Sequence, residues 1–432
     1  MAETAFLDSL LAPRSRLPAA SSGWLKQRRS AALERAGALS VPSARDEDWR
    51  FTDLSPLYRL KLQPADGKAP DAAALEPLAI AEAGTRVVLV DGRYVESLSR
   101  PMAGDGVYVG GLARALQLHE AALQQALAST ARIESDLFAA VNTAFLHDAA
   151  VVYVGPDRKL DTPVHILQIS TGAGTASHPR VLVVCGRGSE ATVVEDFVSL
   201  GAQSSLTNAL AEIAVDVNAG LRHVRVQREA DDVYHIGNTS IALARDARLR
   251  SWAVTLGGRL SRHNFNVLQQ GEGIDCEIDG LALISGRQLA DTHSFIDHAH
   301  PRGRSRQLHK TVVGGAAHAV FNGKIRVNAG AQQTDSGQQS RTLLLTPRAH
   351  VDAKPQLEIF ADDVKCAHGA TVGQLEADEI FYLKSRGLSE ATARNLLTYA
   401  FAAEVVEGIP VRSLVNALEE RIMQQTQTAE LK

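Results

Sequence analysis

The middle of the chain contains, at residues 274–279, the alternating sequence IDCEID, in which every second side chain is apolar. Residues 213–217, IAVDV, alternate in the same way. A period of two is typical of a strand that buries one face. Short β-branched runs of this kind, separated by Gly, Asp and Asn, continue from about residue 151 to about residue 375. We therefore expect strands to dominate residues 151–375.

The fold class of this strand-rich region follows from what is missing between the runs. No helix-length amphipathic segment interrupts them, so the crossover helices of a doubly wound sheet are not expected. A sandwich, a barrel or a parallel β-helix remains. Apolar strands with small residues at the corners suit the stacked coils of a β-helix, although no fixed sequence period is visible. The pattern alone leaves the three architectures open.

The two ends of the chain differ from the middle. Residues 1–150 form a mixed, mostly helical region, with a helical pattern at 24–33 behind a capping Ser22, a second at 112–146, and a strand at 85–90. Residues 376–432 are again helical, with one helix from Ser389 to the stop at Gly408 and a last one over 411–422. The predicted units are therefore 1–150, 151–375 and 376–432.

Composition limits the classes of function. The 432 residues include 45 Lys and Arg against 49 Asp and Glu, a balance that gives no basic footprint for DNA or RNA. No stretch approaches the ~20 apolar residues of a membrane span, and the first residues lack a signal-peptide core. Only three cysteines are present, far apart, which favours a reducing compartment. We expect a soluble, cytoplasmic protein that binds neither nucleic acid nor membrane.

The three thiols differ in their surroundings. Cys185 and Cys276 alternate with aliphatic residues and are predicted to be inert core residues. Cys366 and His368 stand two apart, so that both side chains lie on one face if this segment is extended. They would supply two metal ligands, too few for a cluster without others from a second chain. A buried Cys beside a structural His is the equally weighted alternative, because a lone C-x-H is a weak motif.

Other chemistry is not indicated. The stretch from Gly315 to Lys324 resembles a P-loop, but its glycines are too far apart and Ile325 occupies the Ser/Thr position. No G-x-S-x-G elbow is present. Five histidines between residues 293 and 318 match no metal signature, and neighbouring arginines would repel a cation, so we expect a solvated face there. These histidines are His293, His298, His300, His309 and His318.

Dense motifs then point to a family. They are EDWRFTDL at 47–54, RQLHKT at 306–311, AVFNGKI at 319–325, KPQLEI at 354–359, ADDVKC at 361–366, HGATVG at 368–373 and IFYLKSRG at 380–387. This set resembles the SufD-type subunits of the Suf iron–sulfur cluster assembly system. The motifs are distributed over nearly the whole chain. One departure is the run Arg302-Gly303-Arg304, where relatives often carry a Cys before the position of Ser305. A thiol role there is lost.

The resemblance implies a mainly β fold, a right-handed parallel β-helix between N-terminal and C-terminal helical regions. It also implies a non-enzymatic scaffold that pairs with a SufB-like paralogue and binds a SufC-like ATPase through its C-terminal helices. Cys366 and His368 would be transient ligands of iron or of a cluster at the SufB interface. No residue pattern assigns a flavin. The residues expected to contact the ATPase are Leu383, Leu396, Leu397, Phe401 and Val405.

Two alternatives stay open at this point. A purely structural SufD would support its partners without donating ligands. A secreted β-helix enzyme that acts on polysaccharide would need a signal peptide and a carboxylate cluster on one outer face, and the missing signal peptide argues against it. Retention of a cluster by the isolated chain is not expected from either SufD alternative, because two ligands are too few.

Overall fold

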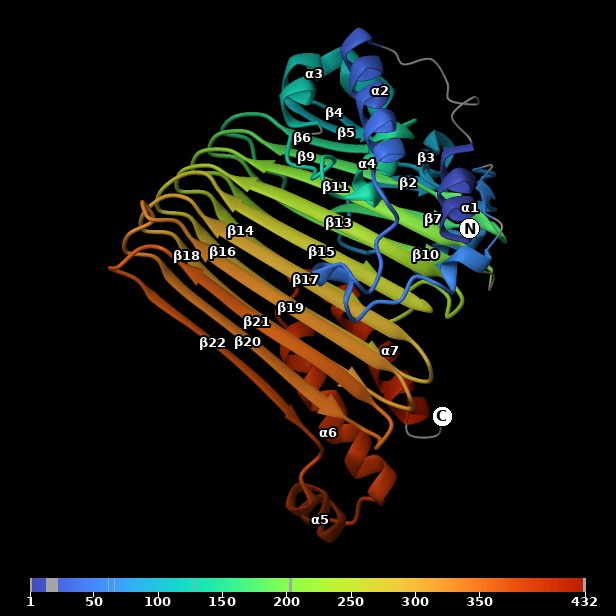
Figure 1. Cartoon of the computed structure of the whole chain (residues 1–432), viewed down its shortest axis with the longest axis vertical. Coiled ribbons are helices and arrows are strands. Elements are labelled where there is room, and N and C mark those ends of the chain that lie inside the picture. The colour runs from blue at the N-terminus through green and yellow to red at the C-terminus, as the bar shows by residue number, and fades with distance from the viewer. Residues whose placement is uncertain are drawn as a thin grey trace.

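The computed structural model describes residues 2–12, 22–60, 62–65, 67–127, 129–201 and 204–429. Two long sheets of mostly parallel strands face each other, and the chain alternates between them coil by coil (Figure 1). This is a parallel β-helix flanked by helices, as the family resemblance implies. The mainly β fold is thereby confirmed, and the sandwich and the barrel are excluded.

Sheet 1 and sheet 2 are defined by their strands. Sheet 1 contains β1 (Gln63–Pro64), β4 (Met102–Gly104), β5 (Val107–Gly111), β6 (Ala150–Val154), β8 (Thr175–Ser177), β9 (Arg180–Cys185), β11 (Leu206–Val215), β13 (Tyr234–Leu243), β15 (Leu260–Gln269), β17 (Leu289–His298), β19 (His318–Val327) and β21 (His350–Ile359). Sheet 2 contains β2 (Thr85–Val90), β3 (Arg93–Tyr94), β7 (Val164–Ser170), β10 (Glu190–Ser199), β12 (Gly220–Gln227), β14 (Arg248–Thr255), β16 (Asp275–Ile284), β18 (Arg304–Val313), β20 (Asp335–Leu344) and β22 (Lys365–Gly373).

The core lies between the two sheets, where the alternating apolar residues of successive coils stack in columns. Val193, Leu221, Leu249, Cys276 and Ile278 belong to one continuous buried cluster. Leu221, Leu249 and Cys276 stack directly in one column, because β12, β14 and β16 pair in parallel and in register. Cys185 lies in the same cluster. The prediction that Cys185 and Cys276 are core residues is confirmed.

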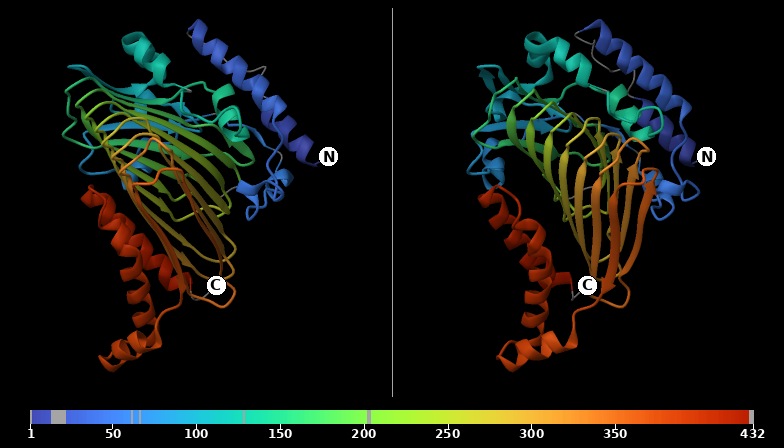
Figure 2. Two further views of the ribbon diagram at one scale, coloured as in Figure 1. Left: turned by 60° about the vertical axis from the view of Figure 1, so that its left-hand side comes forward. Right: turned by 90° about the vertical axis from the view of Figure 1, so that its left-hand side faces the viewer.

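Helices cover the first coils on the outside of sheet 1 (Figure 2). They are α1 (Ala2–Leu11), α2 (Gly23–Ala38), α3 (Leu112–Ala126) and α4 (Leu137–Ala144), with the short 3-10 helices η2 (Glu47–Trp49) and η3 (Leu57–Arg59). Two further 3-10 helices, η4 (Ala72–Leu78) and η5 (Glu96–Leu98), lie instead against the first strands of sheet 2. Phe6, Leu10 and Phe138 bury the outer side chains of Leu206 and Ile236. Ser22 is the N-cap residue of α2, but its side chain makes no capping hydrogen bond.

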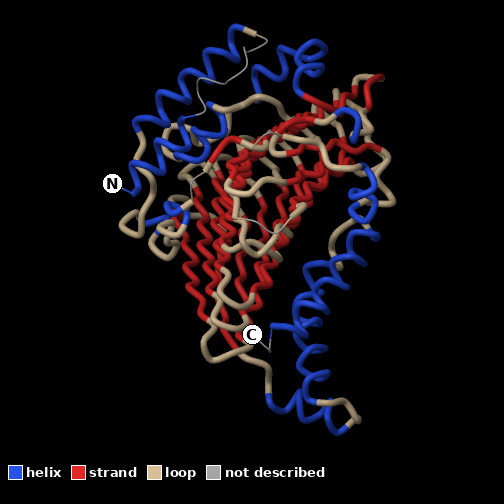
Figure 3. Tube along the Cα trace, turned by 90° about the vertical axis from the view of Figure 1, so that its right-hand side faces the viewer, coloured by secondary structure: helices blue, strands red, loops and turns tan. Residues whose placement is uncertain are grey.

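The C-terminal helices lie against the outside of sheet 2 (Figure 3). They are α5 (Ala377–Ser385), α6 (Glu390–Val406) and α7 (Arg412–Ala429). Val405, Leu414 and Leu418 pack on Val224 and Trp252 of the sheet. Among the described helices, none is long and apolar enough to cross a membrane.

A buried cation ties α6 to the sheet. Lys310 of β18 is almost fully buried, and its ammonium group donates to the carbonyl oxygen of Phe401 at 2.8 Å and to the carboxylate of Glu404. The same ammonium lies 4.5 Å from the centre of the Phe401 ring. Helix α5 makes few such contacts and projects beyond the last coils (Figures 2 and 3).

Candidate functional site

Cys366 and His368 lie on β22, the last strand of sheet 2. This strand pairs in parallel with β20, so that Cys366 is opposite Ser336 and His368 is opposite Gln338. The segment is extended, and alternation along the strand therefore places both side chains on one face. Cys366 packs against the buried cluster around Ile325, which identifies that face as the interior side of the β-helix.

This end of the β-helix is open in the part of the chain that the structure describes. All of β22 except Cys366 is exposed, and β21 is at least partly exposed along its whole length. Ile359, Phe360 and Val372 add exposed apolar surface. An edge strand with unpaired backbone groups is a template for pairing with another chain. The open end therefore has the properties of an interface.

The protonation of the three thiols separates Cys366 from the others. Burial raises the pKa of Cys185 to about 12 and that of Cys276 still further. Partial burial also raises the pKa of Cys366, against a backbone hydrogen bond from Ser336 that lowers it. Cys366 is therefore a thiol in the free chain, and a metal ion must displace its proton to bind. Cys366 is partly exposed and His368 is exposed, so both residues are accessible from outside.

A polar column continues behind this pair into the β-helix. Ser336 and Ser305 share a hydrogen bond of 2.7 Å between their hydroxyls, and the Nε2 of His298 lies 2.9 Å from the Ser305 hydroxyl. The amide of Gln338 donates to the side-chain oxygen of Gln307. The last coils are thus lined by small polar groups in place of the aliphatic columns of the earlier coils.

Still deeper, the interior holds carboxylates that are paired with histidines. His223 lies 2.8 Å from the carboxylate of Glu195, and His235 lies 2.6 Å from that of Glu229. Burial acts to raise the pKa of Glu229, but the charge and hydrogen bond of His235 hold it below its ordinary value. Buried charges must be paired in this way to be tolerated. The sequence analysis missed both pairs. His223 and Glu195 are 28 residues apart and become neighbours only through the register of the coils. His235 and Glu229 are six residues apart, and Glu229 lies in the turn between β12 and β13.

The expectation of a solvated histidine face is wrong for His298 and His309. Both are buried, because the strand alternation places them on the interior side of β17 and β18. The ring of His309 lies 4.5 Å from that of Phe321, centre to centre. His300 is exposed as expected, and the Nε2 of His293 lies 3.0 Å from the buried carboxylate of Asp291.

A groove of about 980 Å³ runs along the last coils of sheet 2, and β22 forms one of its walls, with Cys366 and His368 in the lining. Arg306 and Arg341 contribute to it, together with the acidic residues Glu277 and Asp279. Burial, together with the charges of Glu277 and Glu404, raises the pKa of Asp279 to about 6. The groove therefore combines charges of both signs directly beside the strand that carries Cys366.

The residues expected to contact an ATPase differ in their exposure. Leu396 is exposed on α6, and Leu383 and Leu397 are half-buried. Phe401 packs toward Lys310, and Val405 is completely buried against sheet 2. Phe381 and Tyr382 of α5, 73% and 55% exposed, were not singled out, although they adjoin Leu383 in the same motif. The sequence pattern did not indicate that these two aromatic rings are exposed on a protruding helix.

Comparison with known proteins shows which families this chain resembles. Two family models match: the SUF system FeS cluster assembly SufBD core domain over residues 168–401, and the SufBD protein N-terminal region over residues 2–166. The chain is 38% identical to an iron–sulfur cluster assembly SufBD family protein of Synechocystis, over 92% of this chain and 90% of that protein.

Two further relatives are similar over nearly their full length. The iron–sulfur cluster assembly protein SufD of Escherichia coli is 34% identical over 91% of each chain. Protein ABCI7, chloroplastic, of Arabidopsis thaliana is 36% identical over 94% of this chain and 86% of that protein. Similarity of this extent covers both the β-helix and the helices on either side of it.

Proposed function

This chain belongs to the SufBD family of the SUF iron–sulfur cluster assembly system, as a SufD-type member, and we propose that it is a non-enzymatic scaffold on which a cluster is assembled together with partner subunits. Iron and sulfide are the cargo of such a scaffold, held transiently and passed on. The proposal concerns where this chain holds the cargo and which surfaces bind the partners.

The observation that carries the proposal is the position of Cys366 and His368 at the open end of the β-helix. A cluster normally takes four protein ligands, and this pair supplies two. The remaining ligands must come from a second chain that meets the same end. A SufB-like paralogue fits, since its own β-helix could continue the sheets from the edges of β21 and β22.

The chemistry of the pair suits release more than storage. An imidazole can replace a thiolate on a cluster iron and is the weaker ligand of the two. Cys366 is protonated in the free chain, so loss of the metal is assisted by return of the proton. A site of this kind binds its cargo only while the partner completes it.

The second partner would bind elsewhere. The exposed rings of Phe381 and Tyr382, with Leu396 on the next helix, form an apolar surface that this chain leaves uncovered. We assign the contact with a SufC-like ATPase to this surface, which we call the α5 surface. Val405 is excluded from it, because its side chain is fully buried against sheet 2.

The decisive experiment replaces His368 by Ala in the chain coexpressed with its SufB-like and SufC-like partners. We expect the complex to assemble normally while its iron and sulfide content falls sharply. Cys366→Ala should give an intermediate loss, because Cys366 is only partly exposed at the open end, whereas His368 is exposed there. The matched control is His300→Ala, which removes an exposed histidine outside the open end.

The purely structural alternative predicts a different result. If the scaffold donates no ligand, His368→Ala complexes contain the wild-type amount of iron and sulfide whenever they assemble. Subunit stoichiometry from native mass spectrometry separates that outcome from a simple failure to assemble. Normal cluster content in an intact His368→Ala complex would reject the ligand role.

A further inference from the structure

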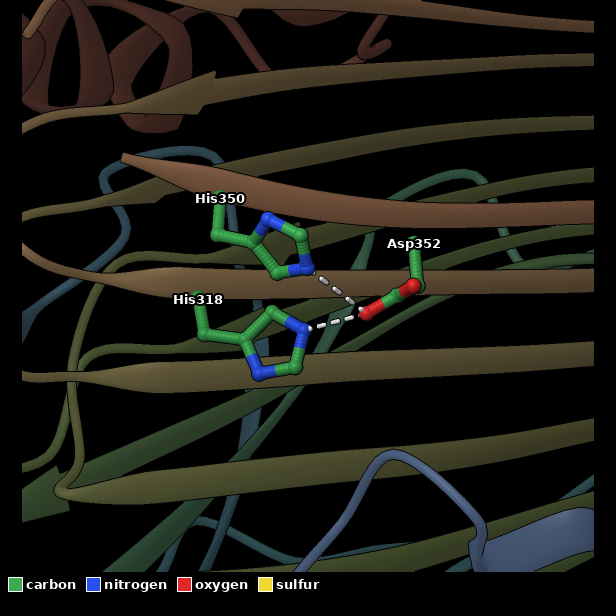
Figure 4. A group of neighbouring side chains, drawn as sticks. All are labelled: His318, His350 and Asp352. Carbon is green, nitrogen blue, oxygen red and sulfur yellow. Dashed lines mark hydrogen bonds and ion pairs between the residues drawn. The ribbon is translucent and has the colours of Figure 1, made fainter. Parts of the chain in front are cut away.

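A second group of metal-ligating side chains lies on the outside of sheet 1, away from Cys366 and His368 (Figure 4). His318 begins β19, and His350 begins β21, the last strand of the sheet. The two histidines are paired residues of neighbouring parallel strands, and Asp352 follows two positions after His350 on the same face. All three side chains therefore meet above adjacent strands.

Their donor atoms converge. The Nε2 atoms of His318 and His350 lie 2.8 Å and 3.2 Å from the same carboxylate oxygen, Oδ2 of Asp352 (Figure 4). One ligand atom from each residue lies within 4.8 Å of the others. With metal bonds of 2.0–2.1 Å, neighbouring ligands of a tetrahedral ion are separated by about 3.3 Å. A small rotation of the two rings would admit an ion between them.

The surroundings favour a cation. His350 is 66% exposed and can move, whereas His318 and Asp352 are each about three-quarters buried and hold their positions. Within the described chain, the ion-pair partners of Asp352 are these two histidines. The next basic residue on this strand face, Lys354, is paired instead with Glu47 at 2.6 Å. No Lys or Arg among the described residues forms an ion pair with this carboxylate.

We propose that His318, His350 and Asp352 form a binding site for a divalent first-row transition metal ion. Two imidazoles and one carboxylate are ligands that suit Zn²⁺, Fe²⁺ and Co²⁺, and three protein ligands leave coordination positions open to water or to a second molecule. The site is separate from the Cys366–His368 pair in sheet, in face and in ligand type. It does not depend on a partner subunit, since this chain supplies all three ligands.

The proposal is tested on the isolated full-length chain, freed of any histidine tag. Co²⁺ is the probe, because its visible absorption reports nitrogen and oxygen ligation, and calorimetry gives the stoichiometry and the Kd. We expect one tight Co²⁺ per chain, competed by Zn²⁺. The double variant His318→Ala/His350→Ala should weaken binding roughly 100-fold, and Asp352→Asn about 10-fold or more, as expected for lost ligands.

Two controls make the result specific. His300→Ala removes an exposed histidine elsewhere and should leave the Kd unchanged. His350→Ala alone, at a largely exposed position, should weaken binding while thermal unfolding without metal stays as in the wild type. Retained Co²⁺ binding in the double variant, its loss in His300→Ala, or no binding by the wild-type chain would each overturn the proposal.

Discussion

The three thiols of the chain should react at very different rates, because only Cys366 has exposed surface. Burial keeps Cys185 and Cys276 protonated and out of reach, and the thiolate is the reactive form. We predict that a disulfide reagent such as Ellman's reagent modifies one thiol in the native chain and three after unfolding. Cys366→Ala should reduce the native value to zero. Rapid modification of two thiols in the folded wild type would contradict the buried positions.

Because histidines are buried in the core, we predict that the free energy of unfolding falls in mild acid. Burial lowers the pKa of His298 and of His309 to about 4, whereas an unfolded histidine titrates near 6.5. Between pH 6.5 and pH 4 the unfolded chain therefore binds more protons than the folded chain. Each such histidine should lower the free energy of unfolding by about 1.4 kcal/mol per pH unit as the pH falls through this window.

His309→Gln isolates one of these contributions. The glutamine does not titrate, so the slope of stability against pH should become shallower by about 1.4 kcal/mol per pH unit between pH 6.5 and pH 4. Urea unfolding at several pH values measures the slope, which is independent of any constant destabilisation by the substitution. His300→Gln, at an exposed position, should leave the slope unchanged. An unchanged slope in His309→Gln would show that this histidine is protonated in the fold.

At the residue scale, sequence reasoning found the pair that stands two residues apart on one strand and missed the pairs whose members lie on different strands or across a turn. The spacing of Cys366 and His368 already placed them on one strand face. His318 and His350 are 32 residues apart and become neighbours only through the register of one coil on the next. The same alternation argument, applied to β17 and β18, would have assigned His298 and His309 to the interior.

At the scale of elements, strands were predictable because one buried face imposes a period of two. The coil period was not, because its length varies. Leu206 pairs with Tyr234, Tyr234 with Leu260, and His318 with His350, which are offsets of 28, 26 and 32 residues. Turns of different length absorb the variation, as at Asn218, which adopts a positive φ of 57° at a corner. A variable offset hides a repeat from any search at fixed period.

The exposed helix α5 leads to a prediction about the ATPase. Phe381→Ser combined with Tyr382→Ser removes most of the apolar area of the α5 surface, and we expect the SufC-like ATPase to be lost from the copurified complex. Stability of the chain should change by less than about 0.5 kcal/mol, because both side chains are exposed. Co-purification and urea unfolding measure the two effects.

The control for this prediction is a buried position of the neighbouring helix. Val405→Ala leaves a cavity between α6 and sheet 2 and should destabilise the chain by about 1–3 kcal/mol without reducing ATPase binding to the folded protein. Deletion of the whole helical region would be a poorer test, because it would uncover Trp252 and its apolar neighbours. Undiminished ATPase binding by the double serine variant would remove the α5 surface from the proposed interface.

At the scale of the whole molecule, the two ends of the β-helix differ in their neighbours. The N-terminal helices pack on the first coils, whereas β21 and β22 end the stack with free edges (Figure 1). The α5 surface lies on α5 and α6, and of these two helices α6 packs on the outer face of sheet 2 (Figure 3). The molecule thus presents two separate surfaces, one formed by strand edges and the other by helix α5 and its neighbour.

Two separate surfaces should be separable by mutation. Phe360 and Val372 are exposed apolar residues at the open end, and burying a charge at an interface without a partner is costly. We predict that Phe360→Glu combined with Val372→Glu weakens binding of the SufB-like paralogue roughly 100-fold or more, by leaving two unpaired carboxylates in the contact. ATPase binding by the same variant should remain at the wild-type level.

The Phe381→Ser/Tyr382→Ser variant should show the reverse pattern, so that each variant is the control for the other. If either variant lost both partners while remaining folded by circular dichroism, the two contacts would depend on one another, and the independence of the open end and the α5 surface would be wrong.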